Sequence, residues 1–387
     1  MVISYYDKGL ERYLQIDLDS CNTADMPALL PEKDIEGLPT QKFGSSEDGK
    51  YDYLCSFKYN LRDDMARKIR RRFFRRTNDN GKIEEMFTKW DRSDFQPNNY
   101  CFLKENLFFT IASFSETGEN AAYFCDISEN IDGDNAKELW RTNAYPYSFH
   151  LSPDKRRLSY HLAGHDDEFN PKGHYAINIM DMDGTRHLVC SEEGHLFFGP
   201  VWSPDGNWLL FQDCFPPEDP AHHFSDIAVC KPDGNGFKRL TEGRNCYFAT
   251  SFGLDGYRMG GSNCPIWTPD SKIIYSPMLP DSHPDCHFDN TQRDHEELIY
   301  DPSMGKGGCG FSILDPKTGE SKELTPAQEG CWDFRPRLSK DGKWLLYTHN
   351  EFGKAGEIKL RNMETGDIRF ITNGKNGLGA DHAAFAE

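Results

Sequence analysis

One short phrase returns along this chain and limits its fold more than any other feature. It reads GPVWSPDGNWLLFQ at 199–212, CPIWTPDSKIIYS at 264–276 and RPRLSKDGKWLLYT at 335–348. In each copy, two runs of aromatic and branched residues flank a polar turn. Such runs are typical of β-strands, and turns rich in Pro, Asp and Gly connect strands closely. Each copy therefore predicts a β-hairpin.

A second pair of strands follows each hairpin. After the copy at 199–212, the segment DIAVCKPDGNGFKRLTEG at 226–243 contains a strand, an Asp-Gly turn and another strand. The segments GFSILDPKTGESKELT at 310–325 and EIKLRNMETGDIRFIT at 357–372 have the same pattern. Each copy therefore predicts a four-stranded antiparallel meander.

The meanders form an array with a spacing of roughly 50 residues, as in other repeat architectures. They begin near Gln41, Asn99, Tyr147, Gly199, Asn263 and Phe334. Residues 1–31 add three strands and residues from about 380 to 387 add one, which together complete a seventh meander. Such a closure leaves no free sheet edge. We predict a single all-β domain over 1–387, a seven-bladed β-propeller whose last blade joins the N-terminal strands to the C-terminal strand.

Charge and composition exclude several functions. The formal net charge is −18, which repels nucleic acid and anionic membranes, so any anionic ligand needs a local positive pocket. No apolar stretch approaches the roughly 18 residues of a membrane helix, and the first residues do not resemble a secretory signal. The 12 cysteines lack paired CxxC spacing, which favours free thiols. We expect a cytoplasmic protein.

The phrases WSPDGNWLLF, WTPDSKIIYS and LSKDGKWLLYT, with KRLTEG and RFITNG at the ends of blades, resemble the TolB-type propeller repeat. Within that group, the length, the absence of a signal and the phrase QKFGSSEDGK at 41–50 resemble the cytoplasmic oligogalacturonate lyases. This resemblance implies β-elimination of short uronide chains by histidines and a manganese ion at the propeller mouth. In that family one inner-strand position supplies these histidines, whereas Cys264 and Arg335 take the matching places here.

That inner-strand position lies about four residues before the Ser or Thr of each turn, where a side chain borders the propeller axis. Its occupants are Lys42, Asn99, Ser148, Gly199, Cys264, Arg335 and His382. Lys42, Arg335 and His382 predict a cationic mouth that favours a small anionic ligand, because arginine matches carboxylates with two parallel hydrogen bonds. The alternative is structural: Arg335 pairs with Asp333, or Asp333 and Asp381 connect neighbouring inner strands.

Histidines gather in the predicted loops between the second and third strands, which lie at the same end of the blades as this position. Long loops on a rigid scaffold often carry function, and histidine serves as base, acid or metal ligand near neutral pH. His283 and His287 are candidate ligands for a divalent metal such as manganese, although their spacing is not diagnostic. The histidines in these loops are His161, His165, His174, His222, His223, His283, His287, His295 and His349.

A uronide lyase needs a cation beside the substrate carboxylate, a base and a proton donor. We assign catalytic roles to His161, His165, His174, Arg335, His382, Tyr147 and Tyr247, and expect an Ala variant of Arg335 to lose turnover but to remain folded. We assign substrate binding to Lys42, Gln212, His222, His223, Arg244, Arg258 and His349. The sequence thus predicts a lyase of short uronic-acid-containing saccharides. The alternatives are a non-catalytic binding or scaffold propeller, and a glycoside hydrolase with carboxylates among Asp166, Glu168 and Asp285.

A basic run, RKIRRRFFRR at 67–76, resembles a nucleic-acid patch when read alone. It falls where the third strand of the first blade is expected, so its side chains would alternate between two faces. Asp63, Asp64, Glu84 and Glu85 lie close enough in sequence to pair with it. We therefore interpret the run as a solvated strand with ion pairs.

Overall fold

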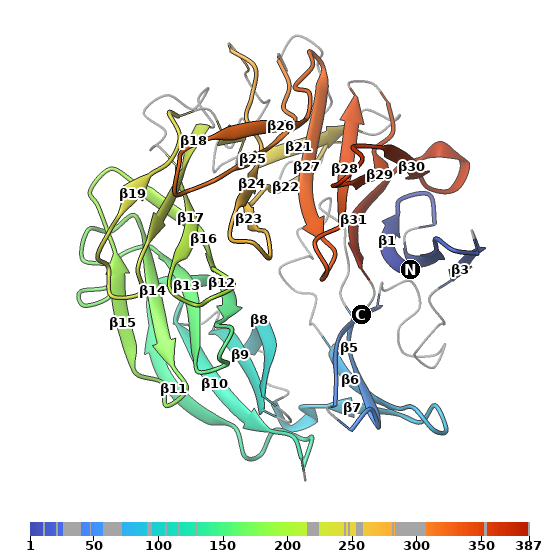
Figure 1. Cartoon of the computed structure of the whole chain (residues 1–387). Helices are drawn as coiled ribbons and strands as arrows, with labels where there is room; N and C mark the ends of the chain where they lie inside the picture. The colour runs from blue at the N-terminus through green and yellow to red at the C-terminus, as the bar shows by residue number, and fades with distance from the viewer. Residues whose placement is uncertain are drawn as a thin grey trace. The chain divides into compact units, whose positions relative to one another are not determined.

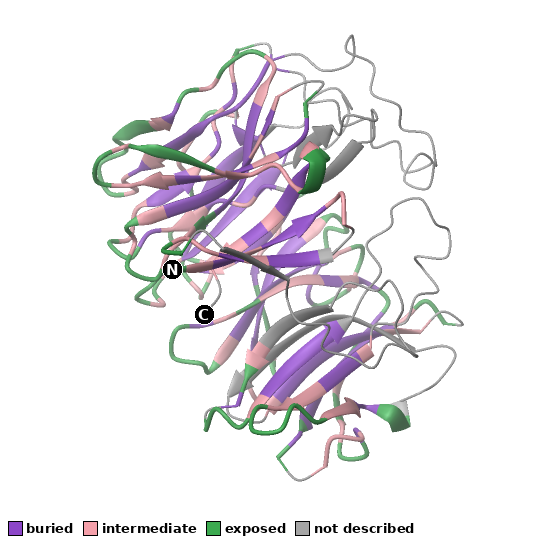
Figure 2. Ribbon diagram, turned by 90° about the vertical axis from the view of Figure 1, so that its right-hand side faces the viewer, coloured by how far each residue is buried: buried purple, intermediate pink, exposed green. Residues whose placement is uncertain are grey.

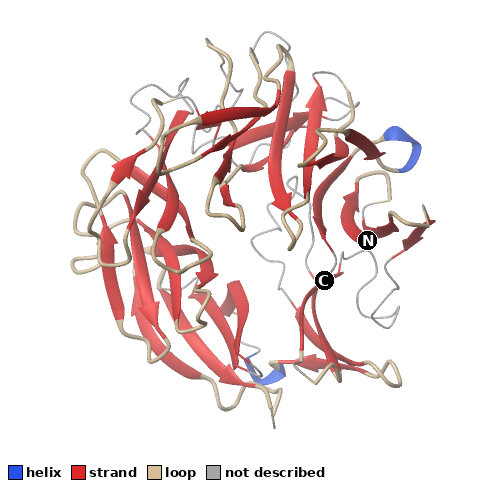
Figure 3. Ribbon diagram, viewed as in Figure 1, coloured by secondary structure: helices blue, strands red, loops and turns tan. Residues whose placement is uncertain are grey.

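The computed structural model describes residues 1–10, 12–20, 22–25, 40–46, 48–56, 72–90, 95–104, 107–114, 117–128, 130–214, 224–243, 245–246, 248–252, 258–280, 282, 307–351 and 354–385. The chain divides into two compact units. Unit 1 comprises Met1–Met26 and Gly194–Glu387, and unit 2 comprises Pro27–Glu193. Among the described residues, strands make up nearly all the regular structure, with two short 3₁₀ turns, η2 (Thr88–Trp90) and η3 (Lys375–Gly377) (Figure 3).

Unit 1 is built from antiparallel meanders in which each strand pairs with the next along the chain (Figure 1). One contains β16 (Leu196–Trp202), β17 (Leu209–Cys214), β18 (Phe224–Cys230) and β19 (Lys238–Arg239), with β20 (Asn245–Cys246) also beside β18. The next contains β23 (Ile266–Trp267), β24 (Ile273–Tyr275), β25 (Phe311–Leu314) and β26 (Ser321–Thr325). Another contains β27 (Cys331–Leu338), β28 (Trp344–Glu351), β29 (Glu357–Asn362) and β30 (Ile368–Thr372). A separate hairpin joins β21 (Phe248–Phe252) to β22 (Arg258–Ser262).

The two ends of the chain meet in one sheet of unit 1. The strand order is β3-β2-β1-β31, in which β1 (Val2–Asp7), β2 (Arg12–Asp17) and β3 (Asn22–Asp25) come from the N-terminus and β31 (Ala380–Phe385) from the C-terminus. Ile3 lies opposite Phe385 and Asp7 lies opposite Ala380. The N-terminal strands and the C-terminal strand therefore share one sheet, as predicted.

Unit 2 repeats the same four-stranded plan. Its strands are β4 (Thr40–Ser45), β5 (Tyr51–Ser56), β6 (Arg72–Thr77) and β7 (Ile83–Met86), then β8 (Phe95–Lys104), β9 (Leu107–Phe114), β10 (Asn120–Asp126) and β11 (Lys137–Thr142), then β12 (Tyr145–Leu151), β13 (Arg157–Ala163), β14 (Tyr175–Asp181) and β15 (Arg186–Cys190). Five of the six predicted hairpin starts therefore lie within an observed inner strand, and the sixth, Asn263, lies three residues before β23. No helix in the described part of the chain is long and apolar enough to cross a membrane.

The hairpin turns use the chemistry that their sequence predicts. In the turn after β16, the Ser203 hydroxyl donates to Asp205 at 2.5 Å and accepts from the Trp208 amide at 3.0 Å. The equivalent Ser339 donates to Asp341 at 2.6 Å in the turn after β27. These bonds satisfy turn groups that would otherwise compete for strand partners.

Buried residues concentrate in the strands of each unit, and exposed residues concentrate at the turns (Figure 2). In unit 2, Phe109, Leu158 and Tyr160 belong to one apolar cluster. In unit 1, the N-terminal Ile3 and the C-terminal Ala380 pack with Leu346 of β28. The packing therefore joins residues that are far apart in sequence.

The basic run at 67–76 forms part of a strand, as predicted, over its described portion. On β6, Arg72 pairs with Glu85 at 2.5 Å and Arg75 pairs with Glu84 at 2.9 Å. Arg76 pairs with Asp52, which the sequence did not suggest, at 2.5 Å. These pairs balance the charge of the arginines on this strand; residues 67–71, with Asp63 and Asp64, lie outside the described residues.

Candidate functional site

The predicted inner-strand position has an unusual backbone. Ser148 on β12 in unit 2, and Gly199, Arg335 and His382 on β16, β27 and β31 in unit 1, have φ values of +53°, +66°, +55° and +53°. The pairing register shifts at each of them, as in a β-bulge. Bulges re-aim side chains, and non-glycine residues with positive φ are uncommon and cost free energy. Only the position, not the left-handed backbone, follows from the sequence.

Arg335 is held by a buried carboxylate. Its guanidinium donates to Asp381, which is completely buried, and Thr348 donates to the same carboxylate at 2.9 Å. Burial alone would raise the pKa of the Asp381 carboxyl, but the Arg335 guanidinium lowers that pKa below its ordinary value. The structure therefore favours the structural alternative in a modified form: Asp381, not Asp333, is the partner, and the charge predicted for Arg335 is balanced internally.

His382 follows Asp381 directly on β31 and is neutral near pH 7. Burial lowers its pKa to about 4 against the opposing effect of Asp381, while Arg335 and Arg337 lower it further. Its amide donates to Asp381 at 2.7 Å, and its Nε2 atom lies 3.9 Å from the carboxylate. The structure thus brings the predicted residues Arg335 and His382 together through one aspartate.

A buried amide network connects Gln212 to Arg335. Asn263 accepts from the Arg335 amide at 3.0 Å through its side chain, and from the Gln212 side chain at 2.9 Å through its carbonyl. Gln212 is completely buried, and its Oε1 atom has no hydrogen-bond partner among the described residues. A buried acceptor without a partner is costly, so this position fits a water molecule or a ligand donor.

Arg337 is a cation that the sequence reasoning missed. It lies two residues after Arg335 on β27, its side chain is exposed, and its Nη1 atom donates to the neighbouring Pro336 carbonyl at 3.0 Å. It forms no ion pair with any residue that the structure describes. It lies close enough to Cys264 and His382 to interact with them electrostatically. The doublet of arginines in RPRLSKDG was the available signal.

His349 and Asp333 form a second histidine site on the same sheet. The His349 Nδ1 atom lies 2.6 Å from Asp333, whose other oxygen accepts from Thr325 at 2.6 Å. Asp333 is buried, and the His349 side chain is 17% exposed. An aspartate on Nδ1 orients the ring and leaves Nε2 for proton transfer. His349 lies within β28, so its predicted loop location was wrong.

A third pair, at His195, was not predicted. His195 Nδ1 lies 2.7 Å from the buried Asp213 on β17, and Arg239 donates to the other carboxylate oxygen at 2.6 Å. Asp213 follows Gln212, so the two side chains point to opposite faces of the strand. The sequence signal that could have revealed this pair is the polar dipeptide QD inside an otherwise apolar strand.

In unit 2, His161 belongs to the core. The sequence analysis placed His161 in a loop, which is wrong: it lies within β13 and is completely buried. Its ring stacks between Tyr147, at 5.2 Å between centroids, and Tyr175, at 5.4 Å. Burial lowers the pKa of His161 to about 3. The predicted catalytic residues Tyr147 and His161 are therefore together, in an aromatic stack.

The remaining residues predicted in unit 2 are placed differently. His165 and His174 are exposed on the segment between β13 and β14, where His165 lies 2.9 Å from Asp167. The hydrolase candidate Asp166 accepts from the Phe169 amide at 2.9 Å and from Thr142 at 2.8 Å, so it stabilises this turn. The backbone of Lys42 lies opposite Leu54.

Most of the remaining predicted residues fall outside the described residues. Arg258 is an exception, because its backbone begins β22. Within the described residues, no group of three His, Cys, Asp or Glu side chains could hold a metal ion. The predicted residues that lie outside are Tyr247, Arg244, His222, His223, His283 and His287, with His295 and Asp285.

Comparison with known proteins identifies the fold. No family model matches the chain. The uncharacterized peptidase YuxL of Bacillus subtilis is 25% identical over 162 residues, which are 39% of this chain and 21% of that protein. This match thus spans about a fifth of the length of the curated relative.

Three solved structures resemble the chain over most of its length. A puromycin hydrolase has a TM-score of 0.59 at 14% identity and covers 95% of this chain and 51% of its own. Oligogalacturonate lyase in complex with manganese has a TM-score of 0.55 at 12% identity, with 95% and 83% covered. The β-propeller domain of the Trilobed protease from Pyrococcus furiosus has a TM-score of 0.51 at 11% identity, with 94% and 90% covered. The chain is therefore an all-β protein with the β-propeller fold, and the number of seven blades stays a prediction.

Proposed function

We propose that the inner strands of unit 1 bind the carboxylate of a short uronic-acid-containing saccharide and that the protein is a carbon–oxygen lyase of such substrates. The observation that carries this proposal is Arg337, an exposed cation beside the neutral His382 on a bulged strand. Arginine binds carboxylates with two parallel hydrogen bonds. A bound carboxylate also favours the charged form of His382, because an opposite charge nearby raises a histidine pKa.

The base in this proposal is His349. Asp333 holds its Nδ1 atom at 2.6 Å, so Nε2 is the ring nitrogen that remains for substrate. In the reaction, Nε2 takes the proton on the carbon beside the carboxylate, a carbon–carbon double bond forms, and the bond to the leaving oxygen breaks. The leaving oxygen then takes a proton from the imidazolium or from water, so the reaction has no net proton change. A cation on the carboxylate stabilises the charge that develops on that group.

The metal that the oligogalacturonate lyase resemblance implies does not fit the described residues. Cys264 and Arg335 stand where that family has histidines, and no described group of three ligands could hold an ion. An arginine repels a divalent cation. We therefore assign no step to a metal.

The test is an absorbance assay for the unsaturated product. The full chain is incubated with short oligogalacturonides, with and without chelator, and the new double bond is followed in the ultraviolet. We expect product with the unaltered protein, a loss of about 10²-fold or more in kcat for His349→Gln, and mainly a raised KM for Arg337→Gln. Thermal melting of each variant controls for folding.

The second candidate is a non-catalytic binding propeller. The internal balance of Arg335 by Asp381 and Thr348 supports it, because that network is complete without a substrate. Binding of oligouronides with no absorbance gain would favour this candidate over the lyase. If no uronide binds and no uronide gives product, the proposal is overturned.

A further inference from the structure

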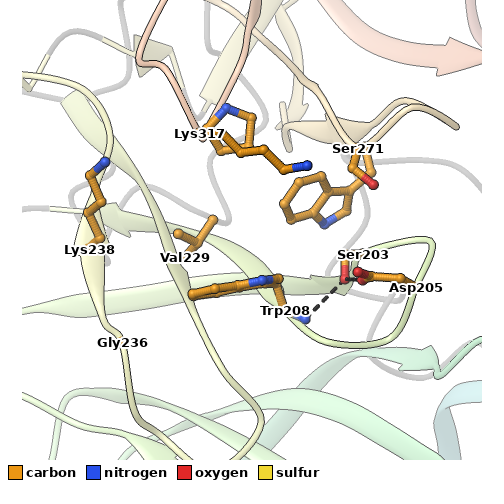
Figure 4. Close-up of a pocket in the computed structure, with 10 residues that line it drawn as sticks. Ser203, Asp205, Trp208, Val229, Gly236, Lys238, Ser271 and Lys317 are labelled. Carbon is orange, nitrogen blue, oxygen red and sulfur yellow. Dashed lines mark hydrogen bonds between the residues drawn. The ribbon is translucent and has the colours of Figure 1, made fainter.

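A pocket of about 250 Å³ opens in unit 1 between the sheet β16–β19 and the sheet β23–β26. Its walls come from the hairpin turns of both sheets, and His349 is not among the residues that line it. Figure 4 shows the Trp208 ring as one wall, with Lys317 and Ser271 across the cavity and Lys238 at its side.

Two tryptophans make the pocket apolar and hold its shape. The Trp267 indole donates to the Val201 carbonyl at 3.3 Å, which fixes its ring. The Trp208 ring packs against Gly236, where a Cβ atom would lie 3.3 Å from the indole. Gly236 also has φ of +68°, so glycine suits both the backbone and the ring. The pocket thus offers rigid aromatic surface for a flat ring.

Three charged side chains line the pocket, two lysines and one aspartate. Lys238 and Lys317 line the pocket, and neither ammonium group pairs with an acid among the described residues. Asp205 also lines it, but that carboxylate already accepts from Ser203 and Asn207 within its turn. An anionic group on the ligand therefore finds two ammonium groups against one carboxylate, and the turn already holds that carboxylate by hydrogen bonds.

Size and wall chemistry narrow the ligand further. Pockets for drug-sized ligands hold about 300–1,000 Å³, so this one fits a single ring with a short substituent. A sugar ring would need several hydrogen-bond partners, and the polar groups of the turn are already paired. We propose that this pocket binds a small aromatic carboxylate, with the ring against Trp208 and Trp267 and the carboxylate at Lys238 and Lys317.

The experiment is calorimetric titration of the full chain with phenylacetate. We expect binding to the unaltered protein and about tenfold weaker binding for Lys317→Gln and for Lys238→Gln, since each loses one charge-assisted hydrogen bond. Lys322→Gln is the matched control: Lys322 is an exposed lysine of β26 outside the pocket, and its variant should bind normally.

Ser271→Gly provides a variant that should fold. Ser271 has φ of +62°, and Gly206 and Gly342 have positive φ at the same place in sister turns. Loss of its hydroxyl should weaken phenylacetate binding by a few-fold at most and leave the melting temperature no lower.

Three outcomes would overturn the proposal. They are no heat with phenylacetate, equal affinity in the pocket variants and in the Lys322→Gln control, and displacement of phenylacetate by galacturonate. The last would show that the pocket recognises an acidic sugar. Because phenylacetate is not a uronide, failure here is separate from failure of the lyase assay.

Discussion

The two units surround a histidine of lowered pKa in different ways. In unit 1, His382 lies on a bulge beside Asp381, Arg335 and Arg337, within a network of charges. In unit 2, His161 lies in a regular strand between two tyrosine rings. Burial lowers both pKa values, to about 4 and about 3. Only His382, however, is next to a cation that no described residue neutralises.

The difference shows what makes a histidine a functional candidate in this fold. A low pKa is common to both residues, so it does not separate a packed histidine from a site histidine. The surroundings do: apolar rings exclude substrate from His161, whereas an exposed arginine offers a charge for substrate beside His382. The following predictions test this contrast.

The largest effect should come from Arg335→Ala. Its removal leaves the Asp381 carboxylate buried and unpaired, which costs about 3–5 kcal/mol of unfolding free energy. Denaturant unfolding measures this loss. This expectation replaces that of an inactive but stable variant, because the sequence did not reveal the buried partner.

A double variant sharpens the same test. Arg335→Met combined with Asp381→Asn removes both charges, so it should lose less stability than Arg335→Ala alone. If the unfolding free energy of Arg335→Ala lay within about 1 kcal/mol of that of the unaltered protein, the buried pair would be contradicted and Arg335 would be a free cation.

The second effect is a loss of stability in acid. A histidine with a folded pKa below its unfolded value of about 6.5 binds fewer protons when folded, so stability falls as the pH drops below that value. The pKa values of about 3 for His161 and about 4 for His382 place this loss between pH 6.5 and the folded values. Each histidine can contribute about 1.4 kcal/mol per pH unit.

His161→Phe separates the two contributions. Phenylalanine keeps the stack with Tyr147 and Tyr175 but cannot be protonated, so its unfolding free energy between pH 6.5 and 4.5 should fall less steeply. The matched variant His382→Gln should reduce the slope as well. An unchanged slope in both variants would mean that neither residue is held neutral.

The third effect concerns the bulges themselves. Gly199 has φ of +66°, and a Cβ atom there would lie 3.0 Å from the Cys264 sulfur, so Gly199→Ala should cost about 1–3 kcal/mol. Ser148 in unit 2 has φ of +53°, so Ser148→Gly should instead stabilise by up to about 1 kcal/mol. Thermal melting of both variants tests whether the two units share this backbone; shifts of the same sign would contradict it.

The smallest effect should come from the basic strand of unit 2. Arg75 pairs with Glu84 at 2.9 Å and lies 4.4 Å from the centre of the Tyr51 ring, at a partly exposed position. Partly exposed pairs contribute little, so Arg75→Gln should cost less than about 1 kcal/mol by chemical denaturation. A larger loss would show that this strand depends on its charges as strongly as unit 1 depends on Arg335.

The repeat was predictable because its signals are local. Aromatic and branched runs specify strands, and Ser203 with Asp205 specifies the turn between them through contacts two to five residues apart. The position of Arg335 and His382 followed from the same register. The final sheet followed because residues 1–31 and 380–387 each lacked partners of their own.

The site was less predictable because its decisive contacts are not local. Arg335 donates to Asp381, which lies 46 residues away in the sequence, and no local pattern in either segment indicates this pairing. The histidine-rich segments suggested loops, yet His161 and His349 belong to strands whose neighbours are buried on both faces. A strand that is buried on both faces has no polar face, so alternation carries no signal there.

The most direct test of the central claim is calorimetric titration of trigalacturonate into the full chain and into two matched arginine variants. Arg337→Gln removes the exposed cation on the inner strand β27, and Arg369→Gln removes an exposed arginine from β30. We predict that binding to Arg337→Gln is about tenfold weaker or lost and that Arg369→Gln binds like the unaltered protein. Equal affinities for all three proteins would contradict the claim that the inner strands of unit 1 hold the anion.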